Sequence, residues 1–181
     1  TIEITLTDPQ AAILNSNADR NLLMMGQGGG KTNTMGNLSY LLSQNVPDVM
    51  GLIAANTYRQ LTNSTLKEIF KQWASLGFTK YTEANPSGSY VIDRTPPKTF
   101  TPHKYIFRDN DSKIYCKNGA VIVVASLDNY MALEGMELGW ALLDETEARK
   151  EEAVTEVITA RLREKGLYKS DGDYRFSHTG T

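Results

Sequence analysis

The sequence predicts a single α/β domain in which helices cover both faces of a mostly parallel β-sheet, giving three layers. Three observations support this prediction. Apolar runs of strand length alternate along the chain with segments of helical periodicity. These runs are continuously apolar, which is typical of strands buried on both faces. A glycine-rich turn joins the first run to a helical segment, as in folds that bind ligands at the sheet edge.

Composition agrees with one globular domain. Of the 181 residues, 40% are hydrophobic and 22% charged, which is ordinary for a domain with a sizeable core. The net charge of −2 does not indicate that the domain as a whole binds nucleic acid, and it does not exclude a local basic surface. The only cysteine, Cys116, rules out an intramolecular disulfide framework, and we expect it to pack in a strand. No apolar run has membrane-spanning length and no signal peptide is seen, so no membrane association is expected.

The first half of the chain predicts three helices and two strands. Thr7 is positioned to cap a helix, with Pro9 in its first turn and Gln10 at the capping-box position. The expected elements are helix 10–16, strand 22–25, helix 31–43, strand 49–55 and helix 61–76. The last of these is strongly amphipathic and ends before Gly77.

The second half begins with a different kind of segment. Residues ~79–118 contain four of the six prolines, which favours a β-rich antiparallel insertion at the sheet edge. Short strands are expected at 90–92, 105–107 and 113–116, followed by a hairpin turn at Asn118 and Gly119. The remaining expected elements are strand 121–125, helix 129–133, strand 140–143, helix 151–164 and strand 174–177.

The glycine-rich turn predicts a phosphate-binding loop. Its sequence is Met25-Gly26-Gln27-Gly28-Gly29-Gly30-Lys31-Thr32, which matches G-x-x-x-x-G-K-S/T except that Met25 replaces the first glycine. Backbone N–H groups would surround phosphates, Lys31 would add a positive charge, and Thr32 would supply a hydroxyl for Mg²⁺. A purely structural glycine-rich turn is the alternative. The residues predicted to bind nucleotide are Gln10, Gln27, Gly28, Gly29, Gly30, Lys31 and Thr32.

A second motif strengthens this interpretation. Four apolar residues at 140–143 precede Asp144 and Glu145. We predict that Asp144 joins Thr32 in holding Mg²⁺, and that Glu145 activates the attacking water, so that Glu145 and Lys31 are the catalytic residues. Alone, the two acids could simply cap the next helix. Together with the glycine-rich loop they predict an NTP hydrolase, with ATP and Mg²⁺ as cofactors. In a mostly parallel sheet the loops 26–32, 56–60, 126–128, 144–147 and 178–179 would share one edge.

With these motifs in this order, the chain resembles the ATPase domain of the large terminase subunit of tailed bacteriophages. The resemblance extends over nearly the whole chain and includes Thr57-Tyr-Arg-Gln-Leu, Asn63-Ser64, Gly119-Ala-Val-Ile-Val, Ala132-Leu-Glu-Gly135 and Thr159-Ala-Arg-Leu-Arg163. It implies a P-loop NTPase fold of the ASCE, RecA-like type. It also implies an ATPase that drives double-stranded DNA into the procapsid.

The resemblance implies several further roles. Ser177, His178 and Thr179 match the family's coupling motif. The implied partners are double-stranded DNA, the portal protein, the small terminase subunit and other copies in a ring, although the isolated domain could be monomeric. The implied location is the host cell cytoplasm. We expect the chain to be a piece of a longer protein; the family's C-terminal nuclease domain does not occur in it, so no nuclease activity is expected.

Two departures from the family concern the arginine finger. Many members have a basic residue at the position of Gln27 and an arginine at that of Glu134. Both changes remove a candidate for stabilising charge in the transition state. Arg161 is the remaining candidate, because it falls on the apolar face of its predicted helix. The alternative for Arg161 is a structural ion pair.

Other assignments have competing interpretations. Gln10 could read adenine, or its amide could serve only the capping box. The basic residues within 93–117 could contact DNA, or could form an ordinary solvated surface. A helicase-type DNA-dependent ATPase core is the alternative enzyme. A non-catalytic nucleotide-binding assembly module is the alternative outside enzymes.

Overall fold

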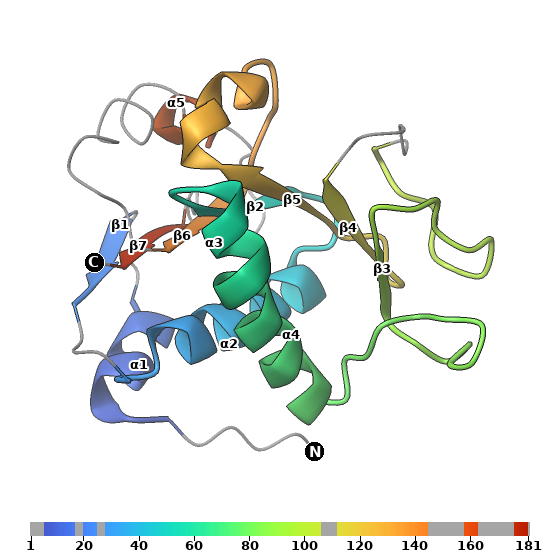
Figure 1. The fold of residues 1–181 in the computed structure, drawn as a ribbon, viewed down its shortest axis with the longest axis horizontal. Coiled ribbons are helices and arrows are strands. Elements are labelled where there is room, and N and C mark those ends of the chain that lie inside the picture. Colours follow the sequence, from blue (N-terminus) through green and yellow to red (C-terminus); the bar gives the residue numbers. More distant parts are fainter. Residues whose placement is uncertain are drawn as a thin grey trace.

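The computed structural model describes residues 6–16, 20–24, 28–105, 112–144, 158–162 and 176–180. Its centre is a seven-stranded sheet of order β1-β7-β6-β2-β5-β4-β3, seen nearly edge-on in Figure 1. The strands are β1 (Arg20–Leu23), β2 (Met50–Ala55), β3 (Tyr90–Ile92), β4 (Lys113–Cys116), β5 (Val121–Ser126), β6 (Trp140–Asp144) and β7 (Phe176–Gly180). The first five strands in the spatial order are parallel, β4 runs antiparallel to β5, and β3 runs antiparallel to β4.

Helices cover both faces of this sheet. They are α1 (Asp8–Leu14), α2 (Lys31–Asn45), α3 (Tyr58–Gln60), the π-helix η1 (Leu61–Thr65), α4 (Leu66–Ser75), the 3-10 helix η2 (Leu127–Leu133) and α5 (Thr159–Arg161). In the view of Figure 1, α1, α2 and α4 lie below the sheet, and η2 and α5 lie above it. The predicted three-layer α/β fold is therefore confirmed.

Each face of the sheet has its own hydrophobic core. The core on the side of α2 and α4 contains alternate residues of β2 and β6, such as Ile53 and Leu142. The core on the opposite side contains the residues between them, such as Leu52 and Leu143, together with Ile158 from the segment around α5. Burial on both faces explains why β2 and β6 are continuously apolar in sequence.

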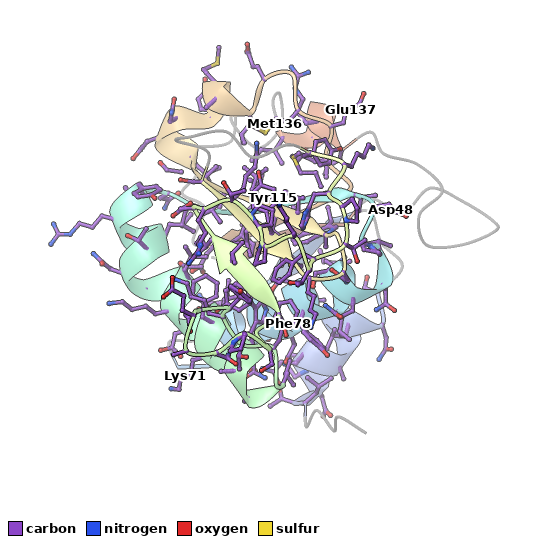
Figure 2. All side chains as sticks on the ribbon, turned by 90° about the vertical axis from the view of Figure 1, so that its right-hand side faces the viewer. Asp48, Lys71, Phe78, Tyr115, Met136 and Glu137 are labelled. Atoms are coloured by element: carbon purple, nitrogen blue, oxygen red, sulfur yellow. The ribbon has the colours of Figure 1, made fainter. Side chains whose placement is uncertain are left out.

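The insertion is built as predicted around an antiparallel pair. β3 pairs with β4, and β4 joins β5 through a turn in which Gly119 has a φ of 101°. A small core of Val91, Phe100, Tyr115 and Val121 holds the insertion to the sheet edge. Figure 2 looks onto this side of the molecule, with Tyr115 near its middle and Lys71 at its periphery. The strand expected at 105–107 is not confirmed, because Tyr105 lies in a bend and the next two residues are outside the described ranges.

Other expected bounds also differ from the structure, since the helix expected over 10–16 is α1 and the strand expected over 22–25 is β1, each beginning two residues earlier. The helix expected over 61–76 begins earlier, at Tyr58, and contains the π-helical turn η1 before α4. Thr57 caps it by accepting the N–H of Gln60, at 3.1 Å, which explains the earlier start. The helix expected over 129–133 is a 3-10 helix from Leu127. Of the helix expected over 151–164, only residues 158–162 are described, and α5 lies within them.

Candidate nucleotide-binding site

The carboxyl ends of the parallel strands define one edge of the sheet. Asp144, the last residue of β6, is paired with Ala55 at the end of β2, and Ala55 is paired in turn with Ser126 at the end of β5. The loop that precedes α2 follows β1, whose last residue Leu23 is paired with Gly180 of β7. The predicted loops after β1, β2, β5 and β6 therefore begin at the same edge.

The described part of the glycine-rich loop requires glycine at two positions. Gly28 and Gly30 have φ values of 77° and 83°, a left-handed conformation that side chains disfavour. A Cβ atom on Gly30 would also lie 2.9 Å from Nε2 of Gln10. The loop backbone thus approaches α1 closely and leads directly into the first turn of α2.

Gly30 forms the N-cap of α2 without a side-chain cap, and the first turn of this helix contains no acidic residue. Its carbonyl oxygen accepts the N–H of Thr34, at 2.9 Å, and the Thr34 hydroxyl, at 3.0 Å. Lys31 and Thr32 are the first two helical residues and are half-buried. A helix that begins this way favours an anion at its N-terminus, because the helix dipole is positive there.

Gln10 is buried, and both the oxygen and the nitrogen of its side-chain amide form hydrogen bonds within the protein. Its Oε1 accepts the backbone N–H of Thr7 at 3.0 Å, which is the capping-box contact. Its Nε2 donates to the carbonyl of Gly30 at 3.4 Å. Gln10 therefore forms the capping box and also lies beside the glycine-rich loop, while its contact with a nucleotide stays a prediction.

Asp144 is 5% exposed and accepts a hydrogen bond from Thr65: the Thr65 hydroxyl lies 2.6 Å from Oδ2 of Asp144. Thr65 is the last residue of the π-helix η1 and is fully buried. Thr65 belongs to none of the motifs identified in the sequence. The feature that could have indicated it is its place as the polar member of a helical row that otherwise consists of apolar residues: Leu61, Thr65, Ile69 and Trp73.

The donors that the structure places at this edge are suited to Mg²⁺. The Thr32 hydroxyl and the Asp144 carboxylate are both oxygen donors, and Mg²⁺ is commonly held by one or two carboxylates together with substrate phosphates. Gly28 leaves open space beside the loop backbone, because a Cβ atom there would meet nothing within 4 Å. Gln27 and Glu145, the other predicted residues of the site, lie outside the described ranges.

Comparison with solved structures finds the same fold in phage proteins. The large terminase ATPase domain of Thermus phage P74-26 is 17% identical with a TM-score of 0.53, covering 98% of this chain and 66% of that one. A large terminase from a thermophilic bacteriophage is 14% identical with a TM-score of 0.62, covering 98% and 39%. The large terminase of bacteriophage HK97 is 12% identical with a TM-score of 0.59, covering 98% and 33%. The chain has the fold of a large terminase ATPase domain.

The likeness to terminase ATPase domains lies in the fold. No family model matches the chain, and no curated protein matches it in sequence. The chain spans between 33% and 66% of the length of the three terminase structures. Within the described residues, no helix is both long enough and apolar enough to span a membrane.

The strand order places the C-terminal strand β7 inside the parallel part of the sheet. β7 lies between β1, which leads into the phosphate loop, and β6, which ends at Asp144. The strand expected over 174–177 runs instead from Phe176 to Gly180, because it pairs on both sides with β1 and β6. His178 and Thr179 were expected beyond the strand, and they lie within it. The side chains of Ser177, His178 and Thr179 are not described, so their coupling role stays a prediction.

Arg161 lies at the other end of the sheet. Its carbonyl accepts the N–H of Leu138 at 2.8 Å, just before β6 begins. Asp144 is six residues further along, or roughly 20 Å at about 3.3 Å per residue. The structure therefore does not bring Arg161 to the glycine-rich loop of its own chain. Its Nε is buried without a hydrogen-bond partner among the described residues, and no ion pair to it is found there.

Glu134 and Gly135 follow η2 on the opposite side of the sheet from α2. Gly135 has a φ of 83°, so the turn there requires glycine, and Glu134 is exposed. Glu134 is the position at which many terminases were noted to carry arginine. In this chain it presents a negative side chain to the surface.

Proposed function

We propose that this chain is the ATP-hydrolysing motor domain of a viral terminase large subunit, which drives double-stranded DNA into the procapsid. The observation that carries the proposal is that β6 ends at Asp144 on the edge where the glycine-rich loop enters α2. Both features occur in a fold shared with large terminase ATPase domains. The loop, the acidic strand end and the fold would each be insufficient on its own to assign this function.

The residues of the site divide the work as follows. The backbone of Gly28, Gly29 and Gly30 and the first turn of α2 bind the phosphates, and Lys31 adds a point charge. Thr32 and Asp144 hold Mg²⁺, which neutralises phosphate charge when it is bound. Glu145 accepts a proton from the attacking water.

We infer that the arginine that stabilises charge in the transition state comes from a neighbouring subunit. Arg161 lies at the far end of β6 from Asp144, and the positions of Gln27 and Glu134 carry no positive side chain. A ring of copies docked on the portal in the host cytoplasm, with the small terminase subunit, would supply such a residue across an interface. The isolated domain should therefore turn over slowly.

The test is the steady-state ATPase rate of the protein. We compare wild type with Lys31→Ala and Glu145→Gln, and use Lys71→Ala as the control because Lys71 is an exposed lysine on α4. Loss of a phosphate-binding charge or of the general base should lower the rate by about 100-fold or more. Lys71→Ala should leave it unchanged. Equal rates in wild type and both site variants would overturn the proposal.

A further inference from the structure

We propose that Thr65 is a positioning residue that orients the carboxylate of Asp144 for Mg²⁺. The inference rests on the proposed function and extends it to a residue outside the phosphate loop and the strand β6. Thr65 does not touch nucleotide in this proposal. It acts through Asp144.

The contact itself has the properties of an orienting bond. The Thr65 hydroxyl lies 2.6 Å from Oδ2 of Asp144, and both residues are buried, at 0% and 5% exposure. A short hydrogen bond from a hydroxyl to a carboxylate is among the stronger hydrogen bonds in proteins. Because it occupies Oδ2, it restricts rotation of the carboxylate and gives the second oxygen one defined direction.

The π-helical turn sets the direction of Thr65. In η1 the N–H of Leu66 bonds to the carbonyl of Leu61, five residues earlier. Within this turn the hydroxyl of Thr62 donates to the carbonyl of Tyr58, at 3.0 Å. Single π-turns inside helices are rare and occur frequently at functional sites. Here the irregular turn ends at the residue that holds the acid.

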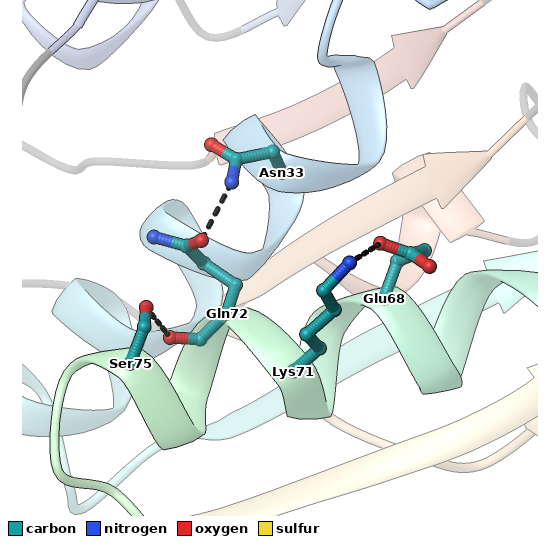
Figure 3. Close-up of polar contacts among 5 residues, drawn as sticks. All are labelled: Asn33, Glu68, Lys71, Gln72 and Ser75. Atoms are coloured by element: carbon teal, nitrogen blue, oxygen red, sulfur yellow. Dashed lines mark hydrogen bonds and ion pairs between the residues drawn. The ribbon is translucent and has the colours of Figure 1, made fainter.

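The helix that follows Thr65 is anchored to the helix that carries Lys31 and Thr32. Nε1 of Trp73 donates to the carbonyl of Gly36 at 3.0 Å and to the hydroxyl of Ser39 at 3.1 Å. Gln72 accepts from Asn33 at 2.6 Å, as Figure 3 shows, and donates to Asn37 at 2.8 Å. α2 and α4, which continues from η1, are thus joined by hydrogen bonds that range from buried to exposed. The two oxygen donors, Thr32 and Asp144, are both held by this pair of helices.

If Thr65 only supplied a hydrogen bond to the buried carboxylate, its replacement would change the stability of the fold and leave the response to Mg²⁺ unchanged. A positioning residue would also change how the site responds to Mg²⁺, and this difference is measurable without turnover. Residues that orient metal ligands typically change metal affinity by about 10–100-fold when they are mutated.

The experiment measures the Mg²⁺ concentration that gives half of the Mg²⁺-dependent binding of a non-hydrolysable ATP analogue to the chain. Thr65→Val replaces the hydroxyl with a methyl group of the same shape and should raise this concentration by about 10–100-fold. Thr65→Ser keeps the hydroxyl and should stay within about threefold of wild type. Thr62→Val is the matched control from the same turn, since its hydroxyl bonds only main-chain carbonyls in the described structure, and it should not change the value.

Melting temperatures without Mg²⁺ separate a loss of fold from a loss of positioning. A Thr65→Val protein that melts lower but keeps the wild-type Mg²⁺ response would overturn the inference and leave Thr65 a structural residue. If Thr65→Val does not fold, Thr65→Cys, with its weak donor, carries the same prediction and the same overturning result. If wild type shows no Mg²⁺-dependent binding of the analogue, the proposed function itself is overturned, and this inference with it.

Discussion

The side chain of Gln10 connects the first helix to the glycine-rich loop: Nε2 donates to the carbonyl of Gly30 at 3.4 Å, while Oε1 accepts the N–H of Thr7 at 3.0 Å. The same amide therefore completes the capping box and contacts the residue at which α2 begins. Of the two interpretations of Gln10 in the sequence, the structure confirms the cap, and the nucleotide contact stays a prediction.

Replacing Gln10 with alanine should weaken ATP and GTP binding by the same factor. The change removes support for the loop, and one net hydrogen bond contributes about 0.5–1.5 kcal/mol, so the loss should be roughly 2- to 10-fold for both nucleotides. Titration of both nucleotides measures it. Asn15→Ala, at the exposed end of the same helix, is the control and should change neither affinity. A loss for ATP with GTP unaffected would show instead that Gln10 reads adenine.

Gly36 allows α2 and α4 to pack closely. A Cβ atom there would lie 2.8 Å from Cβ of Gln72, which a rotamer change cannot move away. Gly36→Ala should therefore lower the free energy of unfolding by about 1–3 kcal/mol, although alanine is the better helix former. Urea denaturation measures the change. Asn45→Ala, in the same helix but exposed, should stay within about 0.5 kcal/mol of wild type, and a stabilised Gly36→Ala protein would contradict the close contact.

The sequence was sufficient to predict the layers of the fold and the edge that carries the site. Strands buried on both faces, such as β2 and β6, are continuously apolar, and the residues at their ends follow from strand direction. The sequence alone did not predict the exact length of β7. Its last residues extend the strand because two parallel neighbours pair with them, and such pairing is a tertiary effect.

Sequence motifs point to candidate site residues, and they miss a contact that packing specifies. Lys31, Thr32 and Asp144 belong to patterns that are local in sequence. Thr65 was missed because its partner is 79 residues away and because the π-turn that aims it inward has no simple sequence signature. Arg161 was the remaining candidate for the arginine finger because it falls on the apolar face of its predicted helix. The structure places that face at the amino end of β6.

His103 should make the fold less stable at mildly acidic pH. Burial lowers the pKa of His103 below its usual 6.5, although its hydrogen bond to the carbonyl of Cys116, at 2.8 Å, opposes this shift. Because the unfolded chain then binds the proton more readily, stability is present above pH 6.5 and falls as the pH is lowered toward the folded-state pKa.

Melting temperatures at pH 7.5 and pH 5.5 test this sign. The decrease in melting temperature from pH 7.5 to pH 5.5 should be smaller in His103→Gln than in wild type. Glutamine keeps a donor for the Cys116 carbonyl and does not titrate. The other histidine, His178, is common to both proteins and cancels in the comparison. Burial raises the pKa of Asp93, which acts with the opposite sign at lower pH, so the range stops at 5.5. An equal loss in both proteins would contradict the assignment.

Cys116 should be unreactive in the folded chain. It is fully buried in β4, and burial raises the pKa of its thiol to about 12. Since only the thiolate reacts, modification by a thiol reagent at pH 8 should require unfolding and be slower than in denaturant by a factor of about 100 or more. Complete labelling of the native protein within minutes would contradict the packing of the insertion against the sheet.

The most direct measurement for the central claim is the affinity of the chain for ATP, with and without Mg²⁺, in wild type, Lys31→Ala and Asp144→Asn. Wild type should bind ATP more tightly when Mg²⁺ is present. Lys31→Ala should lose at least about tenfold in affinity in both conditions, because it removes a charge that faces phosphate. Asp144→Asn should bind ATP without Mg²⁺ as wild type does and lose most of the Mg²⁺ effect. Wild-type affinities and an unchanged Mg²⁺ effect in both variants would contradict a nucleotide site at this edge of the sheet.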